Sequence, residues 1–117
     1  MGLSYRANVA DTRYTPVKSL VQLLEAQASD VSIYDPLIRT WPEMSRDTLG
    51  QFPQAGEYDA IVFAVAHDEF SSIDLEGWLT GAESVILDAC NLLSETERRR
   101  CRQQGNVVES IGRGPEL

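Results

Sequence analysis

Two arginines near the start of the chain, Arg6 and Arg13, could bind an anionic ligand. They lie with Asp11 in a loop ahead of the helix that is expected after Pro16. A guanidinium group keeps its charge and offers a planar fork of donors that matches a phosphate. For Arg6 the alternative is a solvated surface position. Asp11 could orient Arg13, or it could cap the helix, which is the role we favour.

The overall charge narrows the class of ligand. The chain has 10 Lys and Arg residues against 18 Asp and Glu residues, which gives a net charge of −8 and a pI near 4.5. Nucleic-acid binding normally needs a broad electropositive surface, so we exclude it. A small anionic ligand is still compatible with this charge where a few cations converge.

We predict structural roles for the other reactive side chains. Cys90 and Cys101 are ten residues apart without a C-x-x-C pattern, so we expect two reduced thiols and neither a disulfide nor a zinc site. His67 is the single histidine, and we favour a structural role for it over ligand contact. Asp35 and Asp88 follow expected strands and are expected to hold loop amides rather than to act in catalysis.

The elements that must position these residues follow from hydrophobic spacing. A chain of 117 residues with 43% hydrophobic content can bury one core. In chain order we expect a helix after Pro16 to about residue 27, a strand at 31–34, a loop at 37–58 with a short helix near 44–49, a strand at 60–66, a weak helix at 75–79, a strand at 84–87, a helix at 95–104 that begins with a capping box, and a strand at 107–111. Alternating strands and helices predict an α/β fold with a mainly parallel sheet and ligands at the carboxyl ends of its strands.

The strand at 60–66 has no polar residue, which predicts that both of its faces are covered. The polar clusters after Tyr34, Ala66 and Leu87 would then gather at one edge of the sheet. No stretch is long and apolar enough for a membrane helix, and we expect a cytoplasmic protein.

The run from Gly2 to Pro16 resembles the opening of the C-terminal, UDP-sugar-binding domain of the UDP-glucose/GDP-mannose dehydrogenase family, through Gly2-Leu3-Ser4-Tyr5-Arg6, Asp11-Thr12-Arg13 and Pro16. Further motifs are similar in order and spacing, namely Tyr34-Asp35-Pro36, Tyr58 to Phe70, Asp88-x-x-Asn91 and Ile111-Gly112-Arg113. Within the family, the motif Ala64-Val65-Ala66-His67 is most similar to the branch that oxidises UDP-N-acetylglucosamine or UDP-N-acetylgalactosamine to the uronate for surface polysaccharides.

The resemblance implies roles for single residues. Arg6 stands where the family usually has a lysine that approaches the substrate phosphates, and Tyr5 would be an aromatic wall beside the nucleotide, or else a core residue. Arg13 would reach toward the phosphates of NAD. Cys90 departs from the family, which generally has an arginine or lysine at this position that contacts the substrate. Arg6 or Arg113 would then compensate for the lost cation.

The resemblance also implies that residues 1–117 are one domain of a larger enzyme with a Rossmann-like, three-layer fold. In the family an apolar strand precedes the position of Gly2 in the middle of the sheet, and we expect this first strand to be missing from the chain. The expected consequences are marginal stability, strand exchange between copies or a rearranged sheet.

The implied activity is that of an NAD-dependent nucleotide-sugar 6-dehydrogenase. The chain has no G-x-G-x-x-G fingerprint and none of the family's catalytic cysteine motif, so we expect it to bind the nucleotide half of a UDP-sugar and to be inactive alone. NAD would be bound mainly by N-terminal dehydrogenase domains, and a homo-oligomer is expected. The alternative is a non-catalytic α/β binding or interaction module that keeps only the fold.

Overall fold

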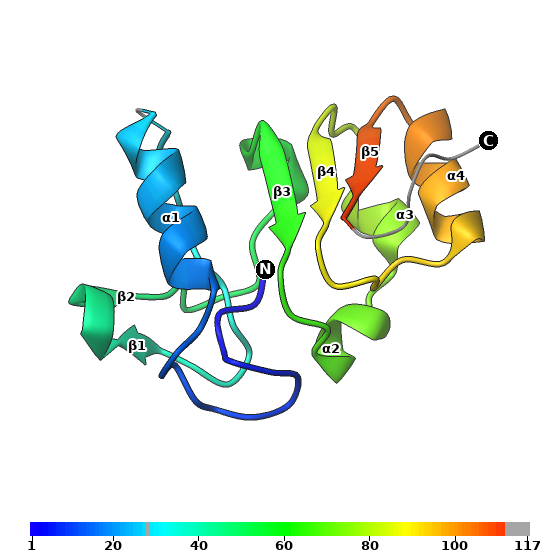
Figure 1. The fold of residues 1–117 in the computed structure, drawn as a ribbon. Coiled ribbons are helices and arrows are strands. Elements are labelled where there is room, and N and C mark those ends of the chain that lie inside the picture. Colours follow the sequence, from blue (N-terminus) through cyan, green and yellow to red (C-terminus); the bar gives the residue numbers. More distant parts are fainter. Residues whose placement is uncertain (28, 112–117) are drawn as a thin grey trace.

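The computed structural model describes residues 1–27 and 29–111 of the chain (Figure 1). Its elements are α1 (Val17–Ala26), β1 (Thr40–Trp41), a 3-10 helix (Pro42–Met44), β2 (Arg46–Asp47), a second 3-10 helix (Ala55–Glu57), β3 (Ala60–Phe63), α2 (Asp68–Ser71), α3 (Leu75–Trp78), β4 (Val85–Asp88), α4 (Glu95–Gln103) and β5 (Val107–Ser110). The predicted α/β fold class is confirmed.

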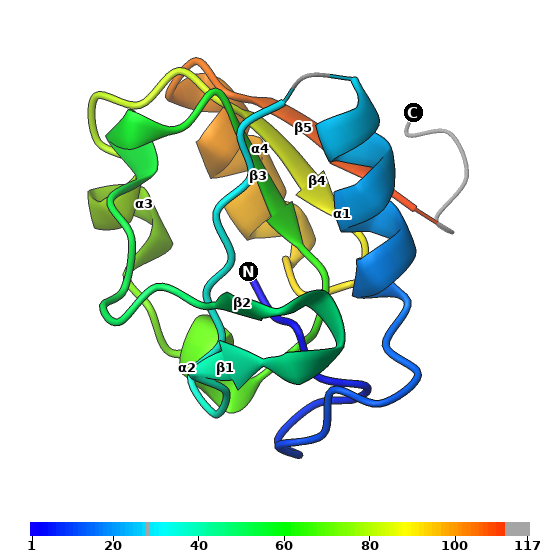
Figure 2. The same cartoon turned by 90° about the vertical axis from the view of Figure 1, so that its left-hand side faces the viewer.

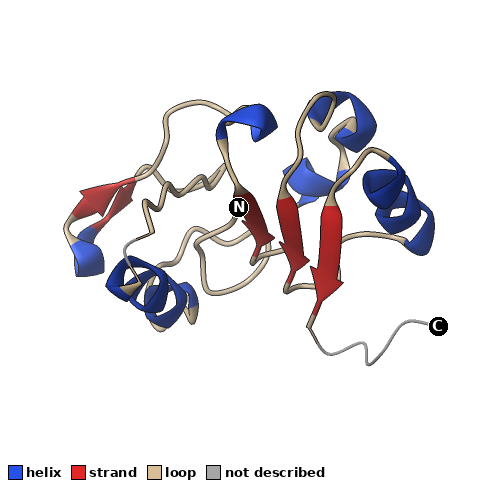
Figure 3. Ribbon diagram, turned by 90° about the horizontal axis from the view of Figure 1, so that it is seen from above, coloured by secondary structure: helices blue, strands red, loops and turns tan. Residues whose placement is uncertain are grey.

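The central feature is a parallel sheet in the order β3-β4-β5. Ile61 pairs with Ile86, and Ile86 pairs with Val108, so the three strands end at the same edge. Seen from above, α3 and α4 lie on one side of this sheet (Figure 3). The parallel pairing confirms the prediction drawn from alternating strands and helices, and it gathers the loops after β3 and β4 at one edge.

The helices cover one face of the sheet. Ile61 and Phe63 of β3 are buried, whereas Ala60 is exposed and Val62 is half-buried. The neighbouring strands repeat this pattern, with Val85 46% exposed at the start of β4. The prediction that β3 is covered on both faces is therefore wrong. An apolar run can form a strand with one incompletely covered face because β-branched side chains also suit a pleated, half-buried surface.

Two hydrophobic clusters support the two sides of the molecule. Figure 2 shows α1 in front of the strands of the sheet. The larger cluster lies between the sheet and α2, α3 and α4, with Phe63 and Leu79 wholly buried. The smaller one joins α1 to the start of the chain and to the hairpin of β1 and β2, and it comprises Leu3, Val17, Val21, Ile33, Ile38 and Trp41. The start of the chain thus packs between α1 and the sheet.

The predicted strand at 31–34 is not a strand in the structure. The Gly2 N–H donates to the Tyr34 carbonyl at 2.8 Å, and the Leu49 N–H donates to the Ile33 carbonyl at 2.7 Å. Each bond joins this segment to a different neighbour, so no continuous ladder forms. The apolar character of the segment is used instead to bury Ile33 in the smaller cluster.

The segment at 37–58 is more ordered than predicted. β1 and β2 form an antiparallel hairpin, and Ser45 turns the chain between them with φ 50°. The short helix near 44–49 was misplaced, because the 3-10 helix covers Pro42–Met44 and residues 46–47 are a strand. Proline favours the first turn of a helix, which accounts for the earlier start.

Met1 continues the pairing of β3 on the edge away from β4. Its amino group donates to the Val62 carbonyl at 2.9 Å, and its carbonyl accepts from the Ala64 N–H at 2.9 Å. A cavity of about 60 Å³ adjoins this edge and is lined by Met1, Ser32, Tyr34, Leu49, Pro53, Tyr58, Ala60, Ile61, Val62 and Trp78. β3 is therefore an edge strand beside a small open space.

Local signals defined α4 well. Ser94 and Glu97 form both bonds of the predicted capping box, and Gly105 ends the helical turn with φ +99°. α1 begins after Pro16 as predicted from the hydrophobic spacing. Within the described residues, no helix has the length and apolar character needed to cross a membrane.

Candidate functional site

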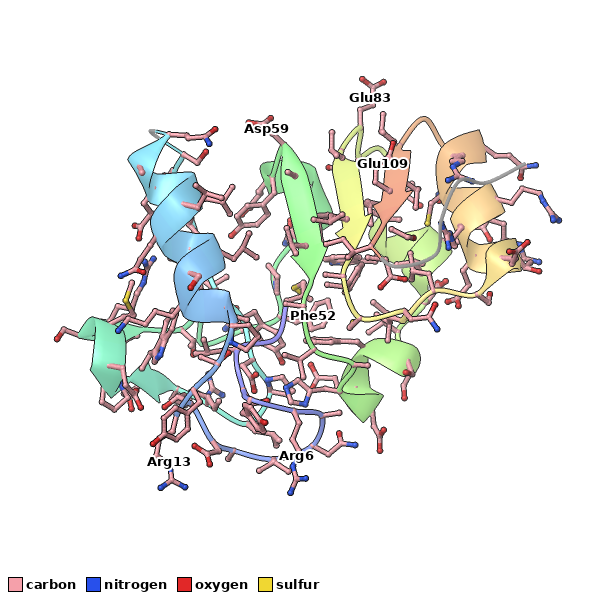
Figure 4. All side chains as sticks on the ribbon, in the orientation of Figure 1. Arg6, Arg13, Phe52, Asp59, Glu83 and Glu109 are labelled. Carbon is pink, nitrogen blue, oxygen red and sulfur yellow. The ribbon has the colours of Figure 1, made fainter. Side chains whose placement is uncertain are left out.

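The loop from Ser4 to Arg13 lies at the carboxyl ends of the parallel strands (Figures 1 and 4). Arg6 and Arg13 project from it, away from the body of the molecule, while Asp59 and Glu83 lie at the opposite end of the sheet (Figure 4). The arginines are thus separated from these acidic residues. The carboxylates of Asp11 and Glu43, however, lie beside the loop, where they bond to Arg13 and Thr12.

A buried network lies beneath this loop and begins at Asp35. This carboxylate accepts the backbone N–H groups of Leu3 at 2.7 Å and Ser4 at 3.1 Å, and the Leu37 N–H at 2.8 Å. His67 Nε2 lies 2.9 Å from the same carboxylate, and both side chains are almost wholly buried. The predicted structural roles of Asp35 and His67 are confirmed, because both bind the start of the chain.

The network continues into the loop through Ser4 and Asn8. Ser4 Oγ lies 3.1 Å from His67 Nε2 and donates to the Arg6 carbonyl at 2.9 Å. The Asn8 N–H donates to His67 Nδ1 at 2.9 Å, and Asn8 Oδ1 accepts the Asp68 N–H at 3.0 Å. Sequence reasoning missed Ser4 and Asn8. The Asn8 backbone has φ 61°, a conformation that asparagine tolerates, and this was the available signal.

Arg13 is paired with Asp11 rather than free. Its guanidinium donates twice to this carboxylate, at 3.1 and 3.0 Å, and its backbone N–H donates at 2.9 Å. These hydrogen bonds lower the pKa of Asp11 and raise the pKa of Arg13. The favoured capping role for Asp11 is wrong, because α1 has Pro16 at its N-cap and no side-chain cap. Asp11 orients Arg13 instead.

Tyr5 and Arg6 are exposed to solvent. Tyr5 is 57% exposed, so the core alternative for it is wrong, and Arg6 is also exposed. Tyr14, which sequence reasoning passed over, is 91% exposed and has φ 60°, an uncommon conformation for an aromatic residue. Arg113, the predicted compensating cation, lies outside the described residues.

Cys90 lies at the same edge of the sheet, directly after β4. Asp88, wholly buried, accepts the backbone N–H groups of Cys90, Leu92 and Leu93, which confirms its predicted role in the loop. The Cys90 thiol lies 3.8 Å from the same carboxylate. Burial, and then the Asp88 charge, raise the pKa of Cys90 to about 11. The thiol is therefore neutral at physiological pH and supplies no charge to a ligand.

Cys90 should accordingly react slowly with iodoacetamide at neutral pH. A pKa of about 11 leaves a thiolate fraction more than about a hundredfold below that of an ordinary cysteine. Mass spectrometry of the folded chain over time would measure the rate, and the chain in denaturant is the control, in which the rate should return to normal. Equal rates in the two conditions would contradict the protected environment. Cys101 is also a free thiol and is buried in the larger cluster.

The described cavities do not include the loop residues. A cavity of about 180 Å³ lies between α3 and α4, and the other adjoins β3. In the part of the chain that the structure covers, no group of three or more His, Cys, Asp or Glu side chains is placed to hold a metal ion. The candidate site is therefore an exposed, braced loop with Tyr5, Arg6 and Arg13 on its outer side.

Comparisons with known proteins agree with the resemblance stated from the sequence. The model of the UDP binding domain of the UDP-glucose/GDP-mannose dehydrogenase family matches residues 1–95. The chain is 34% identical over 99 residues to a UDP-N-acetyl-D-glucosamine 6-dehydrogenase of Pseudomonas aeruginosa, which covers 81% of the chain and 24% of that relative. It is 30% identical over 115 residues to a UDP-N-acetyl-D-mannosamine dehydrogenase of Pyrococcus horikoshii, which covers 97% of the chain and 25% of that relative. The chain thus spans about a quarter of the length of these relatives.

Proposed function

Because the chain belongs to the UDP-glucose/GDP-mannose dehydrogenase family, in which it matches the UDP binding domain, we propose that its Ser4–Arg13 loop binds the UDP part of a UDP-sugar. The observation that carries this proposal is the exposed Arg6 on a braced loop at the carboxyl ends of β3 and β4. Ligands of parallel α/β sheets bind at that edge. Arg6 would contact the diphosphate, and Tyr5 would lie against the nucleotide.

Arg13 would act toward the cofactor. Its side chain is 74% exposed even though the guanidinium is bonded to Asp11, so the guanidinium keeps donors for a second anion. We propose that it balances the phosphate charge of NAD bound by N-terminal dehydrogenase domains in the full-length protein. The complete protein would oxidise a UDP-N-acetylhexosamine to the uronate, for polysaccharide precursors, in the cytoplasm and as a homo-oligomer. The relatives named above act on the N-acetylglucosamine and N-acetylmannosamine forms, as their names state.

The test is calorimetric titration of the chain with UDP and with uridine. Arg6→Ala should weaken UDP binding by about tenfold or more, because a charge-assisted hydrogen bond contributes about 1.5–3 kcal/mol. Uridine lacks the phosphates, so its affinity should not change. Arg99→Ala is the matched control, because Arg99 is exposed on α4, which lies apart from the loop (Figure 1), and its removal changes the net charge equally. Equal losses in the two variants would contradict the role of Arg6.

One observation favours a second candidate function. Cys90 is neutral where the family generally has a cation, which is the change expected in a non-catalytic α/β binding or interaction module. The same titration separates the two functions. A heat of binding for UDP at micromolar to millimolar concentration supports the first, and no heat at millimolar UDP supports the second.

A further inference from the structure

We propose that His67 is a positioning residue that fixes the Ser4–Asn8 loop through a single imidazole tautomer. The proposal rests on the proposed function, because that loop carries Tyr5 and Arg6 to the ligand. His67 itself is 1% exposed and lies under the loop, so it acts through Ser4 and Asn8 rather than by touching the ligand.

The backbone amide of Asn8 decides the tautomer. An amide N–H can only donate, so His67 Nδ1, 2.9 Å away, must accept and is unprotonated. The neutral ring then has its proton on Nε2, where it faces Asp35 Oδ2 at 2.9 Å and Ser4 Oγ at 3.1 Å. This one tautomer is compatible with all three contacts, since Nδ1 accepts from Asn8 and the single Nε2 proton faces two acceptors, Asp35 Oδ2 and Ser4 Oγ. The other tautomer would place two donors face to face at Asn8 and leave Asp35 without a proton donor from the ring.

The tautomer is coupled to the exposed part of the loop at both ends. Ser4 Oγ gives its own proton to the Arg6 carbonyl at 2.9 Å, so the hydroxyl links the ring to the backbone of Arg6. At the other end, Asn8 is held by the ring through its N–H and by the Asp68 amide through its side-chain oxygen. The two attachments flank residues 5–7, which fixes the backbone from which Tyr5 and Arg6 project.

Histidine is suited to this position because its two nitrogens reach opposite partners. Asparagine would place an oxygen near the position of Nδ1 and keep the bond from Asn8, but it is too short to reach Asp35. Glutamine would reach Asp35 and Ser4, but it leaves no acceptor for the Asn8 amide. The pair His67→Asn and His67→Gln therefore separates the loop attachment from the contact with Asp35.

The experiment combines nuclear magnetic resonance with UDP titration. In the unaltered chain, the histidine spectrum should show an unprotonated Nδ1 and a protonated Nε2, and the Asn8 amide should be protected from exchange. His67→Gln should speed exchange of the Asn8 amide and weaken UDP binding, each by about tenfold. His67→Asn should keep the Asn8 protection and stay within about threefold of the original affinity. A ring protonated on Nδ1, or equal effects of the two variants, would overturn the proposal.

Ser4→Ala keeps the test decisive if a His67 variant fails to fold. This variant removes one hydroxyl, so it should keep the His67 tautomer and weaken UDP binding, whereas an unchanged affinity would count against the link to Arg6. The tautomer and the Asn8 protection are measured without ligand. If both measurements give the expected result and UDP does not bind, the proposed function is rejected and the positioning role of His67 is kept.

Discussion

Replacing Asp35 with asparagine is expected to lower the free energy of unfolding by about 3 kcal/mol, because an amide group cannot serve the donors that converge there. The carboxylate accepts three backbone N–H groups and faces His67 Nε2. The NH₂ group of asparagine would meet at least one of these donors, in a place that is 1% exposed to water. Urea denaturation followed by circular dichroism would measure the loss.

Asp11→Asn is the matched control for Asp35→Asn. It removes the same charge from a carboxylate that also accepts a backbone N–H, but the Asp11 side chain is 31% exposed and water can replace its partners. We expect no measurable change in the free energy of unfolding. If the two variants lost equal stability, the effect of Asp35→Asn would come from the net charge of the chain and not from its buried donors.

Gly2→Ala is expected to cost about 3 kcal/mol, through a clash and an unfavourable backbone conformation together. A Cβ atom on Gly2 would lie 2.7 Å from Val65 Cβ and 2.8 Å from Val65 N, and one of these two is a backbone atom. The residue also has φ +96°, which side chains disfavour. The start of the chain would have to move away from the end of β3, so the Ser4–Asn8 loop would be displaced as well.

Gly81→Ala separates the cost of the clash from the cost of the backbone conformation. Gly81 has φ +78° but nothing within 4 Å of an added Cβ, so this variant should cost only about 1 kcal/mol, for the backbone conformation. The difference between the two variants, from thermal or urea unfolding, gives the part due to the contact with Val65. A Gly2→Ala variant as stable as Gly81→Ala would show that the chain start can shift without penalty.

The sequence predicts elements whose signals are local. α4 has its capping box and its terminating Gly105 within a dozen residues, and α1 has its apolar spacing after Pro16. The parallel sheet is also predictable, because β3 and most of β4 are apolar and helices separate the three strands. In such cases the information for an element lies in the element itself.

Elements that depend on a distant partner were harder to predict. The segment at 31–34 has the composition of a strand, yet its two backbone bonds lead to Gly2 and Leu49, and neither neighbour supplies a ladder. The hairpin of β1 and β2 has two-residue strands, which are too short to show an alternating pattern. The uncovered face of the sheet also escaped prediction, because it depends on where the helices pack.

The residues of the candidate site also differ in how far local patterns predict them. Tyr5, Arg6 and Arg13 were predicted to contact ligands because they lie within one short motif that resembles the family, and these roles stay predictions. The network beneath them was found only in part, because His67 is 59 residues from Asn8 and 32 residues from Asp35 along the chain. Structural roles were predicted for Asp35 and His67, but no local pattern pairs them with Ser4 and Asn8.

Arg6 and Arg13 lie at the opposite end of the sheet from Asp59 and Glu83 (Figure 4), although the carboxylates of Asp11 and Glu43 lie beside the loop. At low ionic strength, the net charge of −8 repels a diffusing anion from far away, before the arginines are near. At physiological salt the field is screened beyond roughly 8 Å, so an approaching phosphate senses mainly the end of the molecule that it faces. Salt therefore aids the encounter at the arginine end, but it weakens the final contact between phosphate and guanidinium. Because the two effects oppose each other, association with a phosphorylated ligand should depend less on salt than the two guanidinium groups alone would predict.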